Sequence, residues 1–296
     1  MPRSVVGKRY KHKPFNVITI DNVEEARHWV ARQRAAGRSV GFVPTMGALH
    51  EGHLSLVERS CRENEVTVCS IFVNPIQFNK SEDLEKYPRM PETDIGLLEE
   101  TRCDMLFMPS EQNMYPEPVT KQYSFGHLDE VMEGAFRPGH FNGVAIVVDR
   151  LFRIVQPTRA YFGTKDYQQL LVIREMTRQE EHPTEIIGCP IIREPDGLAM
   201  SSRNIRLTQE QRKHAPAIYE ALRYAKENFR NYTVPDLENE VRKRFNIIPG
   251  AKPEYVTVAD TNTLVPLKKW IPNQPAVMYV AVYMGDIRLI DNMILE

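Results

Sequence analysis

Two apolar runs flank an amphipathic segment between residues 40 and 73. The first run, residues 40–43, is followed by Pro44, which cannot donate to a β-ladder and is expected to stop the strand there. The second run, residues 66–73, is almost continuously apolar, as expected for a strand covered on both faces. From Gly52 onward the intervening apolar residues follow helical spacing. Strand, helix and buried strand form a βαβ unit, which predicts a parallel sheet.

The alternation of strands and helices continues along much of the chain. Further strands are expected at residues 17–20, 104–108, 160–163 and 185–192. After these the pattern changes to one helix capped by Thr208 with its apolar face running from residue 215 to 229, and a second helix capped by Thr233. Strands then follow at residues 255–259, 276–283 and 288–290. We therefore expect an α/β protein with an N-terminal extension (1–16), a Rossmann-like domain (17–190) and a smaller α+β domain (191–296). The smaller domain is expected to close over a ligand as a lid.

The composition excludes several classes of partner. Of the 296 residues, 38 are basic and 39 acidic, giving a net charge of −1, so no charged field favours nucleic acid or a membrane surface. The longest apolar stretch, residues 276–284, is far shorter than the ~20 residues of a membrane span. The basic first residues lack the pattern of a secretory signal. Four scattered cysteines suit a reduced compartment, and we expect a cytoplasmic protein.

Two histidines, His50 and His53, flank the start of the helix that follows the first strand. A helix start offers free backbone N–H groups and a partial positive charge to an anion. Side chains three positions apart project to the same side, so both imidazoles can meet one ligand. Surface or capping histidines are the plain alternative, and a zinc site would need further ligands at short spacing that the sequence lacks. A mononucleotide site agrees better with the pattern.

Polar residues follow other expected strands. Asn74 and Gln77 come after residues 66–73, where ligands bind in open α/β sheets, although a polar turn explains them too. Lys165 lies in the first turn of a helix, where a cation opposes the helix dipole unless a phosphate or the neighbouring Asp166 compensates it. Residues 201–203, Ser-Ser-Arg, can wrap phosphates or form an ordinary loop. The charged stretch 79–91 is either a flap over the site or an exposed connection.

Five ordered blocks carry a resemblance to a known family. They are Pro44-Thr45-Met46-Gly47-Ala48-Leu49-His50-Glu51-Gly52-His53, residues 70–78, residues 137–141, residues 163–169 and residues 196–204. The first resembles the signature of the His-x-Gly-His nucleotidyltransferases, and its wording is similar to that of the pantothenate synthetase (pantoate–β-alanine ligase) family. The similarity extends from about Val17 to the end. It implies ATP-dependent condensation of pantoate with β-alanine through a pantoyl adenylate, giving pantothenate, AMP and pyrophosphate.

The resemblance also implies roles for individual residues. Charge stabilisation would come from His50, His53, Lys165 and Arg203. The expected ATP site comprises Pro44, Thr45, Met46, Gly47, His50, His53, Gly163, Lys165, Asp166, Ile192, Met200, Ser201, Ser202 and Arg203. Pantoate and β-alanine would meet Gln77, Gln169, Asn74 and Arg137. Mg²⁺ would accompany ATP without protein ligands that we can name, no tightly bound organic cofactor is expected, and the family implies a homodimer. For His140 we expect a structural role.

Other interpretations remain open. A related adenylyltransferase would keep AMP on its product, and an aminoacyl-tRNA synthetase would need a basic surface that the sequence lacks. A regulator that only binds nucleotide has no need to stabilise a transition state. Thr164 stands where the family favours glutamate or glutamine, but its neighbours Lys165 and Asp166 agree with the motif.

Overall fold

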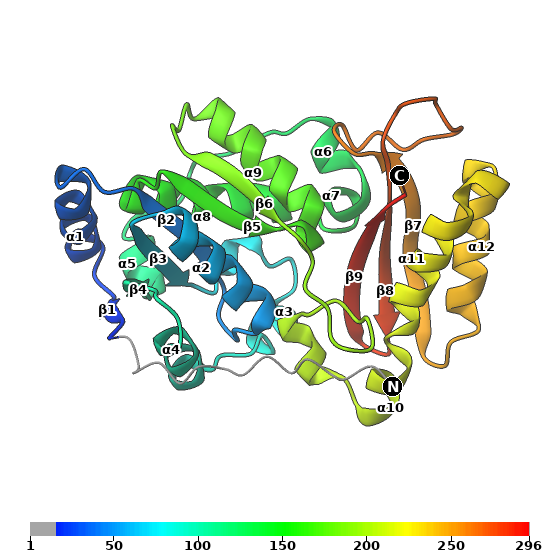
Figure 1. Ribbon diagram of the computed structural model, residues 1–296, viewed down its shortest axis with the longest axis horizontal. Helices are drawn as coiled ribbons and strands as arrows, with labels where there is room; N and C mark the ends of the chain where they lie inside the picture. The colour runs from blue at the N-terminus through cyan, green and yellow to red at the C-terminus, as the bar shows by residue number, and fades with distance from the viewer. Residues whose placement is uncertain (1–15, 296) are drawn as a thin grey trace.

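The computed structural model describes residues 16–295, so all but the last residue of the expected N-terminal extension lies outside the described part. One sheet has six parallel strands in the order β1-β4-β3-β2-β5-β6, and a second has three antiparallel strands in the order β7-β8-β9 (Figure 1). The predicted α/β fold with a smaller C-terminal α+β part is confirmed. The division into domains near residue 190 stays a prediction.

The parallel sheet and its connections occupy the first two thirds of the chain. Its strands are β1 Ile18–Ile20, β2 Val40–Thr45, β3 Val66–Ile71, β4 Met105–Phe107, β5 Arg159–Gly163 and β6 Glu185–Cys189. The longer helices are α1 Val23–Ala35, α2 Glu51–Glu63, α4 Pro91–Glu99, α8 His140–Val155 and α9 Tyr167–Gln179. The short α- and 3-10 helices are η1 Pro75–Gln77, α3 Ser81–Glu85, α5 Glu111–Met114, α6 His127–Glu130, α7 Met132–Phe136 and η2 Thr164–Asp166.

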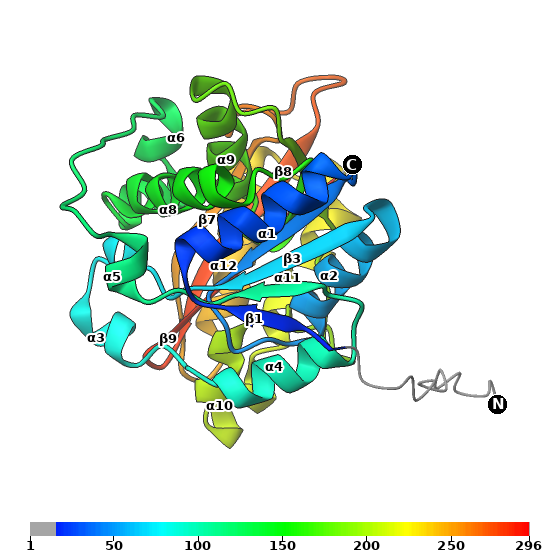
Figure 2. The ribbon, with the colours of Figure 1, turned by 90° about the vertical axis from the view of Figure 1, so that its left-hand side faces the viewer.

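Alternate residues of the central strands enter two different cores. Phe42 and Val68 pack with α1, α8 and α9, whereas Val43 and Cys69 pack with α2 and α4. Helices therefore cover both faces of the sheet (Figure 2). This arrangement explains why residues 66–73 are apolar without alternation.

The expected end of the first strand is wrong. Strand β2 continues through Pro44 to Thr45, and Pro44 is paired in register with Ser70 of β3. The pairing of β2 with β5 reaches only Gly41 and Phe42, so the missing N–H of Pro44 interrupts no ladder on that side. Pairing of β2 with β5 thus stops before Pro44, while β2 stays paired with β3 as far as Thr45.

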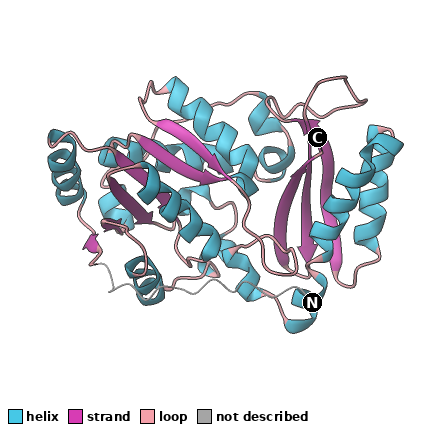
Figure 3. Ribbon diagram, in the orientation of Figure 1, coloured by secondary structure: helices cyan, strands magenta, loops and turns pink. Residues whose placement is uncertain are grey.

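The C-terminal sheet is formed by β7 Ala251–Asp260, β8 Ala276–Met284 and β9 Ile287–Ile294. One face packs against α11 Ala217–Asn228 and α12 Val234–Asn246, which lie side by side on it (Figure 3). The opposite face, including Tyr255 and Tyr279, packs with residues of the α7 and α9 region. The C-terminal sheet is therefore in direct contact with the elements that surround the parallel sheet.

The short helices that precede this sheet in the chain are η3 Ser202–Arg206, α10 Gln209–His214 and η4 Phe229–Asn231. Thr208 and Gln211 form the predicted capping box, and Thr233 caps α12 as predicted. The helix expected to run on from Thr208 is instead two helices, because α10 ends before Pro216 and α11 begins after it. Among the described residues, none of the helices combines the length and apolar character needed to cross a membrane.

Helix α8 approaches η1 without a side chain between them. A Cβ atom on Gly143 would lie 2.6 Å from Cα of Gln77, which real structures do not tolerate. The carbonyl of Gly143 accepts a hydrogen bond of 3.0 Å from Asn74 Nδ2. Glycine is thus required here by the neighbouring backbone, and it brings η1 close to α8.

Candidate functional site

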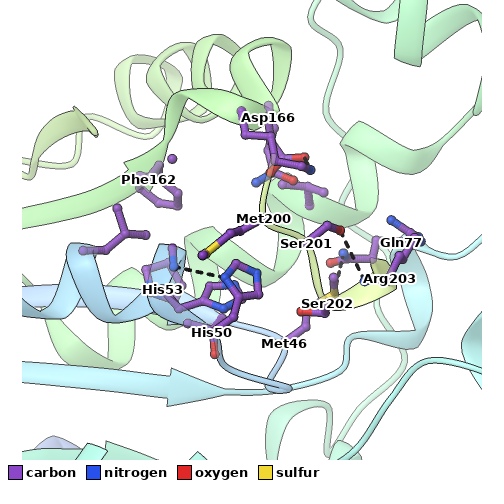
Figure 4. Close-up of a pocket in the computed structure, with 18 of the residues that line it drawn as sticks. Met46, His50, His53, Gln77, Phe162, Asp166, Met200, Ser201, Ser202 and Arg203 are labelled. Atoms are coloured by element: carbon purple, nitrogen blue, oxygen red, sulfur yellow. Dashed lines mark hydrogen bonds and ion pairs between the residues drawn. The ribbon is translucent and has the colours of Figure 1, made fainter. Parts of the chain in front are cut away.

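A cavity lies beyond the carboxyl ends of β2, β3 and β5, where an open α/β sheet binds ligands. Most of the residues expected in the ATP and acid sites line it: Pro44, Thr45, Met46, His50, His53, Gln77, Arg137, Gly163, Lys165, Asp166, Gln169, Ile192, Met200, Ser201, Ser202 and Arg203. Figure 4 shows His50 and His53 beside Met200, with Asp166 above them. Gly47 and Asn74 are absent from the lining and lie behind it.

The two histidines sit at the N-terminus of α2, with ring centroids 4.1 Å apart. His50 is the N-cap, and its Nδ1 accepts a hydrogen bond of 3.1 Å from the Gly52 N–H, so the neutral ring carries its proton on Nε2. Burial and the nearby Lys165 ammonium lower the pKa of His50 to about 4. Burial, His50 and Lys165 also lower the pKa of His53. Both rings are therefore neutral hydrogen-bonding groups at neutral pH.

His53 is half-buried, and its Nδ1 is a buried atom that lacks a hydrogen-bond partner among the described residues. A buried polar atom without a partner costs about 1–3 kcal/mol, so it is normally found where a ligand or water completes it. The His53 ring lines the cavity, so the residue is placed beside a ligand bound there.

The turn before the histidines is fixed by Asp94 of α4. Its two carboxylate oxygens accept hydrogen bonds from Ala48 N–H (2.9 Å) and Leu49 N–H (2.7 Å). Gly47 and Ala48 both have positive φ, of 79° and 47°, and a Cβ on Gly47 would meet the Asp94 carboxylate at 3.0 Å. Asp94 therefore holds a strained turn in one conformation. It was not predicted from the sequence, because a lone acidic residue in a surface-type helix gives no sign of this contact.

A chain of hydrogen bonds fixes the amide end of the site. Gln77 Nε2 donates to Met46 Sδ at 3.0 Å, and Asn74 Nδ2 donates to Gln77 Oε1 at 3.3 Å. His140 Nδ1 donates to the Gln77 carbonyl at 2.8 Å, which leaves His140 Nε2 to accept from Arg137 at 3.0 Å. Asn74 is fully buried, so its contact with the cavity runs through Gln77.

Lys165 lies in η2, immediately after β5, and only 18% of its side chain is exposed. Its Nζ is 3.6 Å from the Asp166 carboxylate, so local compensation by Asp166 exists as the alternative interpretation proposed. Both side chains nevertheless line the cavity, and Gln169 joins them from the first turn of α9. The position of Lys165 is compatible with compensation by Asp166 and with an anionic ligand.

Residues 201–203 connect the cavity to two other segments. Ser202 Oγ donates to the Ala48 carbonyl at 3.0 Å, which joins η3 to the histidine turn. Arg203 Nη2 donates to Asp83 of α3 at 2.9 Å, and Tyr87 from the same stretch lines the cavity. The stretch 79–91 therefore borders the site. Neither Asp83 nor the role of Tyr87 was predicted from the sequence.

The donor set does not resemble a protein metal site. Within residues 16–295, His, Cys, Asp and Glu side chains form no cluster of three or more that could hold a metal ion. The cavity instead combines neutral imidazoles, two amides, hydroxyl groups and the cations of Lys165, Arg137 and Arg203. Such a set suits a ligand with several anionic oxygens and a polar organic group.

Comparison with known proteins identifies the family. Residues 18–294 match the family model for pantoate-beta-alanine ligase. The chain belongs to the pantoate–β-alanine ligase family. It is 50% identical over 273 residues to a pantothenate synthetase of Bacteroides fragilis, covering 92% of this chain and 97% of that protein.

Solved structures agree with this family. The crystal structure of a pantothenate synthetase from Thermus thermophilus matches with a TM-score of 0.88 and 46% identity, covering 94% of this chain and 99% of that one. A pantoate–β-alanine ligase from Francisella tularensis, complexed with beta-gamma ATP and beta-alanine, matches with a TM-score of 0.78 and 36% identity over 94% and 98% of the two chains. The resemblance inferred from the five sequence blocks is confirmed.

Proposed function

We propose that this member of the pantoate–β-alanine ligase family condenses pantoate with β-alanine at the expense of ATP. In the first step, a pantoate carboxylate oxygen bonds to the α-phosphorus of ATP, and the bond to the β-phosphate oxygen breaks, releasing pyrophosphate. In the second step, the β-alanine nitrogen bonds to the acyl carbon, AMP leaves, and the nitrogen loses a proton. The products are pantothenate, AMP and pyrophosphate.

The observation that carries the proposal is the meeting of two kinds of residue in one cavity. His50, His53 and Lys165 offer donors to the phosphate region, while Gln77 and Gln169 offer amides beside it. An amide both donates and accepts, so it can bind a hydroxyl group and a carboxylate without adding charge. Reaction through a mixed anhydride needs an acid held in line with the α-phosphate. The cavity offers donors for the phosphate and, beside them, amides for the acid.

We assign the residues as follows. His50 Nε2–H, His53 and Lys165 stabilise charge at the α-phosphate, and Arg203 with Ser201 and Ser202 binds the β- and γ-phosphates. Gln77 and Gln169 orient pantoate and β-alanine, and Arg137 faces the entering acid. Asn74 contributes by fixing Gln77, with which it shares a hydrogen bond. Gly47 contributes its backbone conformation at the histidine turn.

Magnesium enters this proposal as part of the substrate, MgATP. In this proposal the ion is bound by phosphate oxygens and water, the coordination that Mg²⁺ prefers. The family also implies a homodimer in the cytoplasm, and closure of the C-terminal part over the nucleotide. Sedimentation of the purified protein and small-angle scattering with and without MgATP and pantoate test the dimer and the closure.

The decisive experiment follows pyrophosphate release from MgATP and pantoate, with and without β-alanine. We expect pyrophosphate in both cases and sustained AMP formation only with β-alanine. AMP retained on the product would indicate an adenylyltransferase, and ATP binding without pyrophosphate would indicate a regulator.

Variants then test the assigned residues. We expect Lys165→Ala and His50→Ala each to slow pyrophosphate release about 100-fold or more, because each removes a donor from the reacting phosphate. Glu220→Gln, which changes an exposed ion pair on α11, is the control. A near-normal rate in either test variant removes that residue from the mechanism.

A further inference from the structure

The turn that carries Lys165 is bonded to the C-terminal sheet by one side chain. Asn292 of β9 donates from Nδ2 to the Thr164 carbonyl and to the Lys165 carbonyl, both at 2.9 Å. The Asn292 side chain is buried, with 5% of the residue exposed. Both hydrogens of one amide nitrogen are thus used on consecutive carbonyls of η2.

The preceding residue makes a second connection. Asp291 accepts two hydrogen bonds from the Arg193 guanidinium, at 2.6 and 3.0 Å, and is likewise buried. Arg193 lies in the segment between β6 and η3 that leads to Met200 and Ser201. Because neighbouring residues of a strand point to opposite faces, β9 contacts two cavity-lining segments at once.

The amide is chemically specific at this position. An asparagine nitrogen provides two donors, whereas an aspartate of the same shape would place an oxygen against two carbonyl oxygens. The turn η2 is only three residues long, so its own backbone bonds do little to fix it. A displacement of about 1 Å in a catalytic group can cost on the order of 100-fold in rate.

We propose that Asn292 is a positioning residue for Lys165. By holding the two carbonyls of η2, Asn292 fixes the position of the Lys165 backbone and hence of its side chain in the cavity. Formation of the adenylate then depends on the position of the C-terminal sheet, which carries Asn292. This inference rests on the proposed function, since it assigns Asn292 to the adenylation step. We expect pantoate binding to change little, because the carbonyls that Asn292 bonds belong to η2 whereas Gln77 lies on η1.

The test measures single-turnover pyrophosphate release and MgATP affinity by calorimetry. For Asn292→Ala and Asn292→Asp we expect release roughly 10- to 100-fold slower than in the parent, weaker MgATP binding and an unchanged KM for pantoate. The Asp variant keeps the size of the side chain and should be the slower of the two. Val241→Ala, which removes methyl groups from the C-terminal core far from η2, controls for general loss of stability and should release pyrophosphate normally.

A double-mutant cycle separates positioning from a merely structural effect. If Asn292 acts through Lys165, adding Asn292→Ala to Lys165→Ala should change the release rate and MgATP affinity by less than about threefold. Independent, multiplicative losses would overturn the proposal, as would normal release and binding by both Asn292 variants. Slow Lys165→Ala with normal Asn292 variants defeats this inference alone. Absence of pyrophosphate from the parent protein defeats the proposed function, and the calorimetric cycle still decides whether Asn292 places Lys165 against the nucleotide.

Discussion

Arg203 donates a hydrogen bond of 2.9 Å to the carboxylate of Asp83, and this contact joins α3 to η3 beside the cavity. Arg206 donates to the other oxygen of the same carboxylate at 3.3 Å. Partial burial opposes ionisation, but the two arginines lower the pKa of Asp83, so it is an anion at neutral pH. The Asp83 carboxylate therefore takes up hydrogen-bonding capacity of the Arg203 guanidinium, which we assign to the phosphates of ATP.

Asp83→Asn should tighten MgATP binding. The substitution keeps the shape but removes a negative charge that competes with phosphate for Arg203. Since the pair is partly exposed, we expect a gain of about two- to fivefold, diminishing at high salt. Calorimetric titration at two ionic strengths measures it, with Glu220→Gln as the control. Weaker binding would show instead that Asp83 orients Arg203 for the nucleotide.

Asp94→Asn should impair both stability and catalysis. An amide cannot accept two backbone N–H bonds with both of its polar ends, so the turn at Ala48 and Leu49 loses a partner, at a cost of about 1–3 kcal/mol. We expect pyrophosphate release to fall by roughly tenfold or more because His50 is displaced. Asp104→Asn is the matched control: Asp104 accepts one backbone N–H from Thr67 and lies outside the cavity lining. Equal activity losses in the two variants would contradict a local effect.

Glu133→Gln should be strongly destabilising. Burial alone would raise the pKa of Glu133, but Arg288, bonded to both carboxylate oxygens at 2.6 and 2.9 Å, lowers it to about 2. Removing the carboxylate leaves Arg288 buried with less compensation, at a cost of about 3 kcal/mol.

Urea unfolding measures the loss, and Glu175→Gln, which breaks a more exposed pair with Arg178, should cost less than about 1 kcal/mol. Adding Arg288→Met to Glu133→Gln should recover part of the stability, because a buried guanidinium that has lost one of its two carboxylate partners is then gone and only the Glu254 carboxylate loses its partner. No recovery would indicate that the pair's packing matters more than its charges.

Acidification below about pH 6.5 should destabilise the free protein through its buried histidines. The pKa values of His50 and His140 are lowered to about 4 and about 3, in each case first by burial, and that of His53 is lowered too. Between pH 6.5 and about 4 the unfolded chain therefore binds protons that the folded chain does not, so stability falls as the pH falls. The contribution of Glu133 is lost only at lower pH, as its folded pKa of about 2 is approached.

Urea unfolding at pH 7 and pH 5 tests this pH dependence. We expect a lower free energy of unfolding at pH 5, with a smaller difference in His50→Gln than in the parent. His28→Gln, a change at an exposed position of α1, is the control. An unchanged difference in His50→Gln would mean that this ring contributes nothing to the dependence.

The strands and helix starts could be predicted from the sequence because each is determined by residues close together in the chain. The apolar runs indicated the parallel strands, and Thr208 with Gln211 indicated a helix start, since each depends on residues within a few positions. Pro44 and Pro216 show that nearby sequence alone does not predict where an element ends. Whether a proline ends an element depends on which neighbouring strand needs its N–H, and on whether a new helix can begin after it.

The site was predictable only where chemistry and spacing coincide. His50 and His53 could be found from their positions at a helix start, and the family resemblance extended this to Lys165 and residues 201–203. Asp94 and Asn292 could not be found this way. Each acts on backbone groups far away in the sequence, and a side chain that bonds a distant carbonyl or N–H leaves no periodicity or motif.

The close approach at Gly143 fixes the distance between helix α8 and η1, which carries Gln77. One boundary of the region around Gln77 is main chain against main chain, and position 143 accepts no side chain without moving η1. A side chain at position 143 would have to push the Gln77 backbone away from α8. On our proposed assignment of Gln77, Gln169 and Arg137 to the acid, a related enzyme with a different acid preference should differ at Gln169 or Arg137 while retaining the glycine.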